Sequence, residues 1–146
     1  MTEPLRNPEQ FTPFKRWFNE LGQHGGPLSA PKYHFSMLDI DFCNFKYTTD
    51  GRFRFLFLEA KGGGQSNLSA SQQMFIPMFD LICRALHGKT IAGHIIDYWG
   101  YHTLVMSGHR PDKSDRMTWN GKPIAYEQLL RVLRFEDKAC EYRWAA

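Results

Sequence analysis

The side chains best suited to chemistry lie in one stretch, Leu38–Lys61, which reads LDIDFCNFKYTTDGRFRFLFLEAK. Asp39, Asp41, Glu59 and Lys61 all carry odd numbers, and side chains on a strand alternate between the two faces of a sheet. If both arms of this stretch are strands in the right register, three carboxylates and a lysine share one face. Converging carboxylates repel one another unless a cation compensates them. Oxygen donors of high negative charge suit Mg²⁺ or Mn²⁺. The stretch therefore predicts metal-assisted activation of a water molecule, with the lysine beside it.

The turn between the two arms decides whether these side chains meet. Asp50-Gly51 is a hairpin signal. A three-residue loop that ends at Gly51 sets Asp41 opposite Glu59, whereas a two-residue loop sets odd positions opposite even ones. We favour the three-residue loop because it places the aromatic residues of both arms on one face, which we expect to be buried. The sequence alone leaves the other register open.

Surface salt bridges at an exposed sheet end are the alternative interpretation of the four charged side chains. The apolar residues that flank them on both arms argue against full exposure, because charges at the edge of a buried face need a compensating role.

Composition bounds the class of protein. A chain of 146 residues with a net charge of +3 is expected to form a single domain, preceded by an irregular lead-in over residues 1–11. The three cysteines are far apart in the sequence, and this spacing argues against a disulfide framework or a structural zinc site. The first ten residues lack an apolar signal region and no stretch is long enough to span a membrane, so we expect a cytoplasmic protein without a membrane partner.

The elements that must position the charged residues follow from local patterns. Thr12-Pro13 predicts a helix start, and the glycines from Gly22 predict its end. The remaining expected elements are strands Tyr33–Thr48 and Arg52–Lys61, a helix Ser69–Leu86, a β-like stretch Ile91–Met106, a hairpin Arg116–Ile124 and a helix Tyr126–Glu136. This order predicts the α/β class, with a mixed β-sheet flanked by helices.

Several finer expectations concern these elements. Ser69-x-x-Gln72 has the pattern of a capping box, Pro77 should kink or restart its helix, and Gly100 should split its strand or mark a bulge. The apolar stripe of the second helix is expected to face the core; it comprises Phe75, Met78, Phe79, Ile82 and Leu86. The three glycines at 62–64 are either a flexible exit loop or a place where a phosphate backbone approaches closely.

The central stretch resembles the PD-(D/E)xK nuclease superfamily. The resemblance rests on an Asp on one strand, a hairpin, and apolar residues that lead into Glu59-Ala60-Lys61, followed by the Ser69-x-x-Gln72 helix start. It implies a restriction-endonuclease-like core with the order helix, three strands, helix, strand. It also implies a Mg²⁺-dependent (or Mn²⁺-dependent) endonuclease that hydrolyses DNA. The chain departs from the pattern in two ways, because only two strands are expected before the second helix and no proline precedes either Asp.

The resemblance also assigns roles to residues. Asp41, assisted by Asp39, and Glu59 would be acidic metal ligands, Ala60 would add its backbone carbonyl, and Lys61 would be the catalytic lysine. Glutamine side chains at the start of the helix would contact the metal-bound water or a phosphate, and a glutamate of the first helix would add a ligand. The candidates for these two roles are Gln73, Gln72 and Glu20.

Other residues are candidates for nucleic-acid contacts. Arg110, Lys113 and Arg116 are suited to DNA phosphates. Trp119 either stacks on a base or packs at the second turn, and the sequence leaves both open. A nuclease of one small domain with one site often cuts both strands as a dimer, so the resemblance is also compatible with a homodimer. The alternative function is a catalytically inactive nuclease-like fold that binds nucleic acid or protein.

Overall fold

The structure is a computed structural model that describes Pro13, Trp17 and residues 41–63 and 67–138. The chain divides into two units, Met1–Asp39 and Ile40–Ala146. Within the first unit, only Pro13 and Trp17 are described, and both are helical. The rest of the expected first helix, with Glu20, and Asp39 lie outside the described residues. The fold reported below is that of the second unit, and the expectation of one domain for the whole chain stays a prediction.

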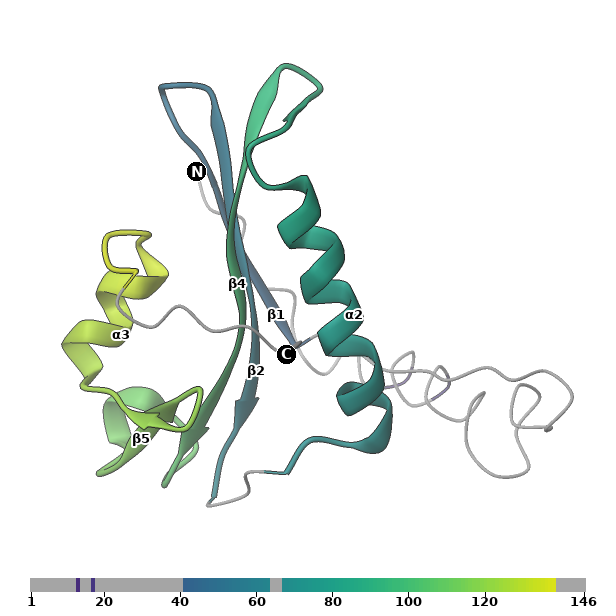
Figure 1. The fold of residues 1–146 in the computed structure, drawn as a ribbon. Coiled ribbons are helices and arrows are strands. Elements are labelled where there is room, and N and C mark those ends of the chain that lie inside the picture. Colours follow the sequence, from purple (N-terminus) through teal and green to yellow (C-terminus); the bar gives the residue numbers. More distant parts are fainter. Residues whose placement is uncertain (1–12, 14–16, 18–40, 64–66, 139–146) are drawn as a thin grey trace, which may run out of the picture. The chain divides into compact units, whose positions relative to one another are not determined.

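A mixed six-stranded sheet forms the centre of the second unit (Figure 1). Its strands are β1 (Phe42–Tyr47), β2 (Arg52–Lys61), β3 (Thr90–Ile91), β4 (His94–Met106), β5 (Met117–Trp119) and β6 (Lys122–Pro123). The order is β1-β2-β4-β5-β6, with β3 paired to β4. The pair β2–β4 is parallel and the other pairs are antiparallel. A parallel pair needs a crossover connection, which the helix between β2 and β4 supplies.

Helices cover both faces of this sheet. Helix α2 (Ala70–Leu86) lies on one side and α3 (Tyr126–Leu133) on the other, while a single 3₁₀ turn, Pro111–Lys113, follows β4 (Figure 1). The predicted α/β class with a mixed sheet flanked by helices is therefore confirmed. Neither α2 nor α3 is long and apolar enough to cross a membrane.

The central hairpin has the predicted register. Cys43 lies opposite Phe57 and Phe45 opposite Phe55, and Gly51 takes the left-handed conformation at the end of a three-residue loop, with a φ of 83°. The two-residue alternative is thereby excluded. The aromatic residues do share one face, but the prediction that this whole face is buried is wrong at the sheet edge. Phe45 and Tyr47 on β1 are 59% and 60% exposed, because α2 packs chiefly on β4, which is separated from β1 by β2.

Helix α2 begins as predicted and presents an unexpected face to the sheet. Ser69 is its N-cap and forms a capping box with Gln72. The helix continues through Pro77 without restarting. Its buried residues are Gln72, Ile76, Asp80 and Cys83. The prediction that the Phe75–Leu86 stripe forms the core is wrong for all its members but Phe79, which is half-buried. The reason is that Gln72 and Asp80 both find polar partners on the sheet, which makes their burial favourable.

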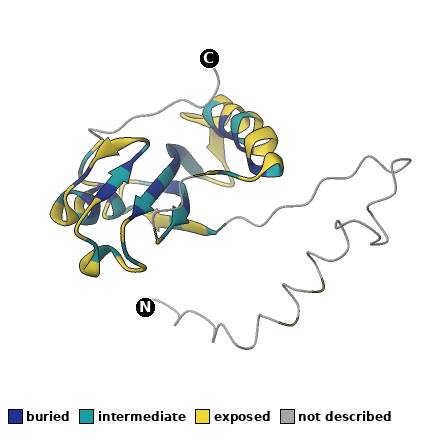
Figure 2. Cartoon of the chain, turned by 90° about the horizontal axis from the view of Figure 1, so that it is seen from below, coloured by how far each residue is buried: buried dark blue, intermediate teal, exposed yellow. Residues whose placement is uncertain are grey.

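Two apolar layers hold the unit together, one on each face of the sheet. Figure 2 shows that buried residues concentrate in the strands, between the helices. The layer beneath α2 is built by Phe55, Cys83, Ile96 and Tyr98. The layer beneath α3 is larger and comprises Leu56, Leu104, Met106, Met117, Trp119, Ile124, Leu129, Val132 and Phe135. This larger apolar layer joins α3 to the sheet, so α3 supports the strands of the candidate site on the face opposite α2.

A β-bulge interrupts the pairing of β4, which is one of the two alternatives that the sequence left open at Gly100. The register between β2 and β4 shifts between Phe55, opposite Tyr98, and Phe57, opposite Tyr101. Two residues of β4 thus face one residue of β2, and Gly100 supplies the positive φ, 98°, that the bulge requires. The predicted second turn is also confirmed, because Asn120-Gly121, with φ values of 53° and 82°, joins β5 to β6. One consequence of the bulge is that Tyr101 projects onto the same face as Glu59.

Candidate active site

Glu59 is the centre of the candidate site, and its side chain is fully buried near the end of β2. The hydroxyl of Tyr101 donates a hydrogen bond of 2.8 Å to its Oε1. The side-chain amide of Gln72 donates one of 2.9 Å to its Oε2. Both oxygens therefore have fixed partners from two other elements, β4 and α2. A carboxylate held in this way is oriented before any ligand arrives.

Asp41 completes a pair of carboxyl groups with Glu59. The Asp41 backbone N–H lies 3.4 Å from Glu59 Oε1, and Asp41 Oδ2 accepts a hydrogen bond of 3.1 Å from the Ala60 N–H. Burial is the largest cause that raises the pKa of Glu59, and hydrogen bonding to the Asp41 carboxyl and the charge of that carboxyl add to it. Against the opposing hydrogen bonds from Tyr101 and the Asp41 N–H, the pKa rises from its ordinary value of 4.5 to about 7. The site therefore holds two carboxyl groups that are costly to ionise together, as expected of a site built for a cation.

Lys61 joins this pair through a glutamine. Lys61 lies two residues after Glu59 on the same face of β2, and its Nζ donates to Gln72 Oε1 at 3.4 Å. The same Oε1 accepts a hydrogen bond of 2.9 Å from the Ser69 N–H, which belongs to the capping box. The cap of α2 thus fixes Gln72 between the carboxylate and the ammonium group. Three elements, β1, β2 and α2, converge at this point because β2 runs into the loop that leads to α2.

The two neighbouring glutamines have different places. Gln72 is buried against Glu59, whereas Gln73 is exposed and its amide donates to the Leu68 carbonyl at 2.9 Å. Successive helical residues point about 100° apart, so only one of the pair can face the sheet. The geometry favours Gln72 over Gln73 as the site residue. Of the other predicted residues, Asp41, Glu59, Ala60 and Lys61 come together, while Asp39 and Glu20 lie outside the described residues.

The basic side chains expected to contact phosphate are partly engaged elsewhere. Arg110 forms two hydrogen bonds with Asp112, at 3.0 and 2.9 Å, in the loop after β4. Lys113 and Arg116 are exposed in the same loop. The positive charges of Lys113 and Arg116 are therefore more available to a ligand than that of Arg110, which the Asp112 carboxylate offsets.

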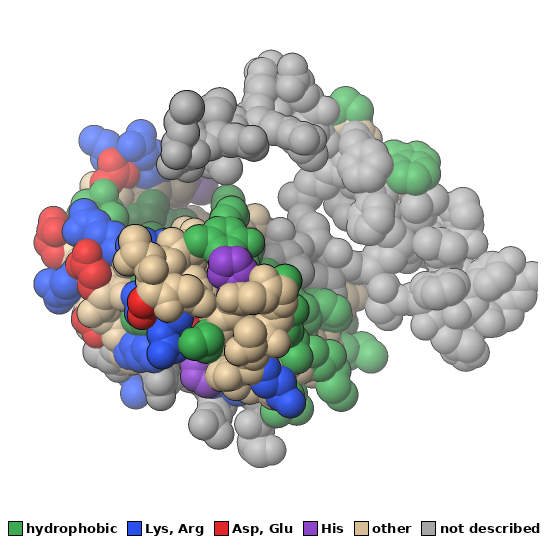
Figure 3. Space-filling model, turned by 90° about the horizontal axis from the view of Figure 1, so that it is seen from above, with side chains coloured by type: hydrophobic (Ala, Val, Ile, Leu, Met, Phe, Trp, Pro, Cys, Tyr) green, Lys and Arg blue, Asp and Glu red, His purple; other side chains and the backbone are tan. Residues whose placement is uncertain are grey.

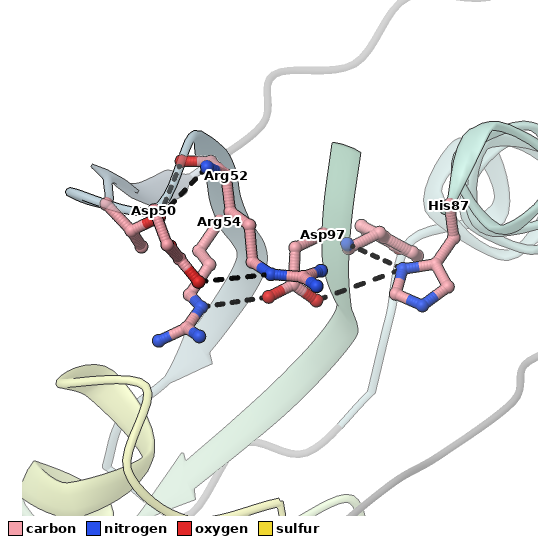
Figure 4. A network of polar contacts seen from close by, with 7 residues as sticks. Asp50, Arg52, Arg54, His87 and Asp97 are labelled. Atoms are coloured by element: carbon pink, nitrogen blue, oxygen red, sulfur yellow. Dashed lines mark hydrogen bonds and ion pairs between the residues drawn. The ribbon is translucent and has the colours of Figure 1, made fainter. Parts of the chain in front are cut away.

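A separate polar network lies at the opposite end of β2, near the hairpin turn (Figure 4). Arg54 donates to Asp97 at 2.9 Å, and Asp97 Oδ1 lies 3.9 Å from His87 Nδ1 at the end of α2. Arg52 pairs with Asp50 at 3.5 Å. Arg54 ties β2 to Asp97 of β4, whereas Arg52 pairs within the hairpin turn. Both arginines lie at the far end of the strand from Glu59 and have carboxylate partners, so they do not belong to the candidate site.

The glycines after Lys61 have a packing role. A Cβ added to Gly62 would lie 2.9 Å from the Gly108 carbonyl oxygen, and one added to Gly63 would lie 3.3 Å from the His109 ring. The Gly63 N–H donates to that same Gly108 carbonyl at 3.0 Å. At these two positions, the close neighbour is therefore the loop after β4. That loop, with Lys113 and Arg116, is held beside the end of β2 that carries Lys61.

Sequence reasoning left the place of one residue open and missed another. Trp119 is fully buried and stacks on His102 with ring centroids 4.6 Å apart, so of its two predicted roles the structure supports packing and not stacking on a base. Gly121 of the turn that follows it is exposed, but Asn120 is half-buried and the indole lies in the layer beneath α3. Tyr101 was missed because an unbroken alternation along β4 would place it on the face opposite Tyr98. Gly100 was the signal that this alternation is broken.

The oxygen donors present fit a magnesium or manganese ion. Mg²⁺ commonly takes one or two protein carboxylates and keeps several waters, so Asp41 and Glu59 form a sufficient protein set. Within residues 41–63 and 67–138, no group of three or more His, Cys, Asp or Glu side chains gathers as a denser metal cluster. Ala60 contributes its N–H to Asp41 in this structure, a contact that differs from the carbonyl ligation implied by the resemblance.

Comparison with known proteins adds no relative. The chain matches no protein-family model, and no curated protein and no solved structure matches it significantly. The functional argument therefore depends on the geometry of the site.

Proposed function

We propose that this chain is a Mg²⁺-dependent nuclease of the PD-(D/E)xK type that hydrolyses phosphodiester bonds in DNA. The observation that carries the proposal is the constellation of Asp41, Glu59, Gln72 and Lys61 at one end of β2, in which a fully buried carboxyl group lies between a second carboxyl and a lysine-bound amide. The pKa of this buried carboxyl is raised to about 7 although three donors surround it, and perturbed carboxyl groups of this kind are common at functional sites.

The order of elements supports the same proposal. The β1–β2 hairpin leads into α2 and then into β4, which is parallel to β2 and adjacent to it. This is the second part of the core that the resemblance implies. The strand and helix that would precede it fall on residues outside those described.

Each residue has a role that follows from its position. Asp41 and Glu59 would hold the metal ion, which when bound supplies a polarised water and neutralises charge on the phosphate. Lys61 would orient or deprotonate the attacking water, or offset the negative charge that grows on the phosphorus oxygens. Gln72 aligns Glu59 with Lys61. Lys113 and Arg116, on the neighbouring loop, would contact the DNA backbone.

The test is cleavage of a panel of labelled DNA substrates with Mg²⁺, Mn²⁺ or EDTA. The panel should contain duplexes, junctions, flaps and single strands. We expect metal-dependent products from wild type and a loss of roughly 100-fold or more in Lys61→Ala. Lys89→Ala is the matched control, because Lys89 is an exposed lysine in the loop after α2 and should be neutral.

A second measurement separates the nuclease from an inactive binding module. Titration of Mn²⁺ by calorimetry should show binding that weakens in Glu59→Gln. If no substrate is cut, Mn²⁺ does not bind, and DNA affinity is the same in EDTA, the proposal is overturned in favour of the binding module.

A further inference from the structure

The outward side of α2 carries an apolar surface that the second unit leaves uncovered. Six large apolar side chains of this helix are exposed, which is unusual for a helix that already packs on a sheet. They are Met74 (72%), Phe75 (38%), Met78 (60%), Leu81 (47%), Ile82 (52%) and Leu86 (37%). We name these six residues the outer α2 face. Figure 3 shows hydrophobic side chains gathered on the side of the molecule where α2 lies.

This face carries almost no charge. The only charged residues of α2 are Asp80 and Arg84, and they pair with each other at 2.9 Å. The Asp80 side chain is 1% exposed and that of Arg84 25%. A helix that met water on its outer side would be expected to carry lysines and glutamates there. The lack of exposed charge also means that two copies of this face can meet without electrostatic repulsion.

The area of the face is close to what a stable dimer needs. A large side chain offers about 200 Å² when fully accessible, so the six residues leave on the order of 600 Å² exposed. Phe45 and Tyr47 extend the surface on the same side of the sheet, because a series of ring contacts links Phe45 through β2 to Phe79 and Phe75. The six residues alone supply about three quarters of the roughly 800 Å² that one partner contributes to a standard interface, and contact with Phe45 and Tyr47 would supply the rest.

We propose that the outer α2 face is a homodimer interface, in which α2 packs antiparallel on α2 of a second copy. Met74, Met78 and Leu81 follow the i, i+4, i+7 spacing of a row that can interlock with its own copy across a twofold axis. An isologous pairing covers all six exposed side chains at once. The twofold axis would pass near Met78 and Leu81, at the middle of the helix.

The proposed dimer would also set the distance between the two candidate active sites. Gln72 marks the site on α2 and lies six residues before Met78, towards the start of the helix. With a rise of 1.5 Å per residue and helix axes 8–10 Å apart, the backbones of the two Gln72 residues would be roughly 20–25 Å apart, and their side chains, which face the sheets and not the interface, would be farther apart. Two sites at that spacing would allow one dimer to act on both strands of a duplex. This consequence rests on the proposed nuclease function, whereas the pairing itself does not.

The test is the mass of the full-length protein by light scattering across a concentration series, without DNA or metal. We expect a dimer for wild type and at least about 100-fold weaker dimerisation for Leu81→Lys, because each copy would bury a charge at the axis. Ile91→Lys is the matched control, because Ile91 is 45% exposed on β3, close to the 47% of Leu81, and lies outside the face. Circular dichroism should show that all three proteins are folded.

Oxidation of methionine identifies what covers the face. In a dimer, Met74 and Met78 resist hydrogen peroxide at high protein concentration and react on dilution. A monomer at every concentration overturns the proposal. If Met74 and Met78 of that monomer resist oxidation, another part of the same chain covers the outer α2 face; if they react, the face is open to a different partner. Equal dimerisation of Leu81→Lys and Ile91→Lys would also overturn it. Since none of these readouts uses cleavage, failure of the nuclease proposal would leave them unchanged.

Discussion

Replacing Glu59 by glutamine should make the apo protein more stable at alkaline pH. The Glu59 pKa rises from 4.5 to about 7 on folding, so the folded protein binds a proton that the unfolded chain has already lost between these values. Stability from this group is complete below pH 4.5 and falls as the pH rises through about 7. Each pKa unit corresponds to about 1.4 kcal/mol, so ionised Glu59 costs the fold on the order of 3 kcal/mol above that range.

Glutamine removes this cost but introduces a smaller one. Its oxygen can accept from either Tyr101 or Gln72, while its NH₂ group faces the donor that remains, a loss of about 1 kcal/mol. We therefore expect Glu59→Gln to gain about 2 kcal/mol in the free energy of unfolding near pH 8. The gain should disappear near pH 5, where wild-type Glu59 is protonated in the folded state.

Urea unfolding in EDTA at these two pH values measures the difference directly. Glu136→Gln is the matched control, since Glu136 is exposed and its substitution should change little at either pH. Excess Mg²⁺ should stabilise wild type and leave Glu59→Gln unchanged, so the difference in the free energy of unfolding between the two proteins near pH 8 should become smaller. The reasoning is refuted if Glu59→Gln is less stable than wild type by the same amount at both pH values, because Glu59 would then be an ordinary, well-compensated carboxylate.

Three further predictions test the surroundings of Glu59. Mn²⁺ affinity measured by calorimetry should fall about tenfold for each pH unit below 7, because the metal displaces one proton from Glu59. Tyr101→Phe removes a hydrogen bond that lowers the Glu59 pKa, so the affinity should begin to fall at a higher pH. An unchanged pH profile would rule out Tyr101 as a positioning residue. Gln72→Ala should lower the cleavage rate by roughly tenfold or more while Gln73→Ala stays near wild type, and the reverse order would assign the role to Gln73. Gly62→Ala should lose about 1–3 kcal/mol of stability in urea, because its Cβ would meet the Gly108 carbonyl at 2.9 Å, and an unchanged midpoint would show that the two loops separate easily.

Local patterns predicted the parts of the fold that depend on neighbours in sequence. The extent of β2, the three-residue turn at Gly51 and the capping box of Ser69 and Gln72 follow from a few adjacent residues, and all three are confirmed. The pairing of Asp41 with Glu59 follows from the turn, because the loop length fixes which residues of the two strands meet. Much of the candidate site could thus be placed before the structure was known.

What the sequence could not give depends on contacts between distant elements. Hydrophobicity favoured the Phe75–Leu86 stripe as the buried face of α2, but Asp80 is buried because the Tyr98 hydroxyl donates to it at 2.7 Å, a partner eighteen residues away. The choice between Gln72 and Gln73 also depends on how α2 is rotated about its axis, because this rotation decides which residues of the helix face the sheet. Tyr101 depends on the bulge in β4, and Trp119 on the large layer beneath α3.

The bulge at Gly100 also divides β4 into two segments, and the alternation of side chains between the two faces shifts by one residue from the first segment to the second. Before it, Ile96 and Tyr98 face α2; after it, Tyr101 faces α2, while Leu104 and Met106 pack beneath α3. A one-residue insertion or deletion between Tyr101 and Met106 would put the two sides of the change out of phase. Either Tyr101 would then leave Glu59, or Leu104 and Met106 would leave the layer beneath α3. At Gly100 the strand already accommodates an extra residue, so loss of that residue would leave both faces in phase. Changes in the length of this strand should therefore be tolerated at the bulge and rejected beyond it.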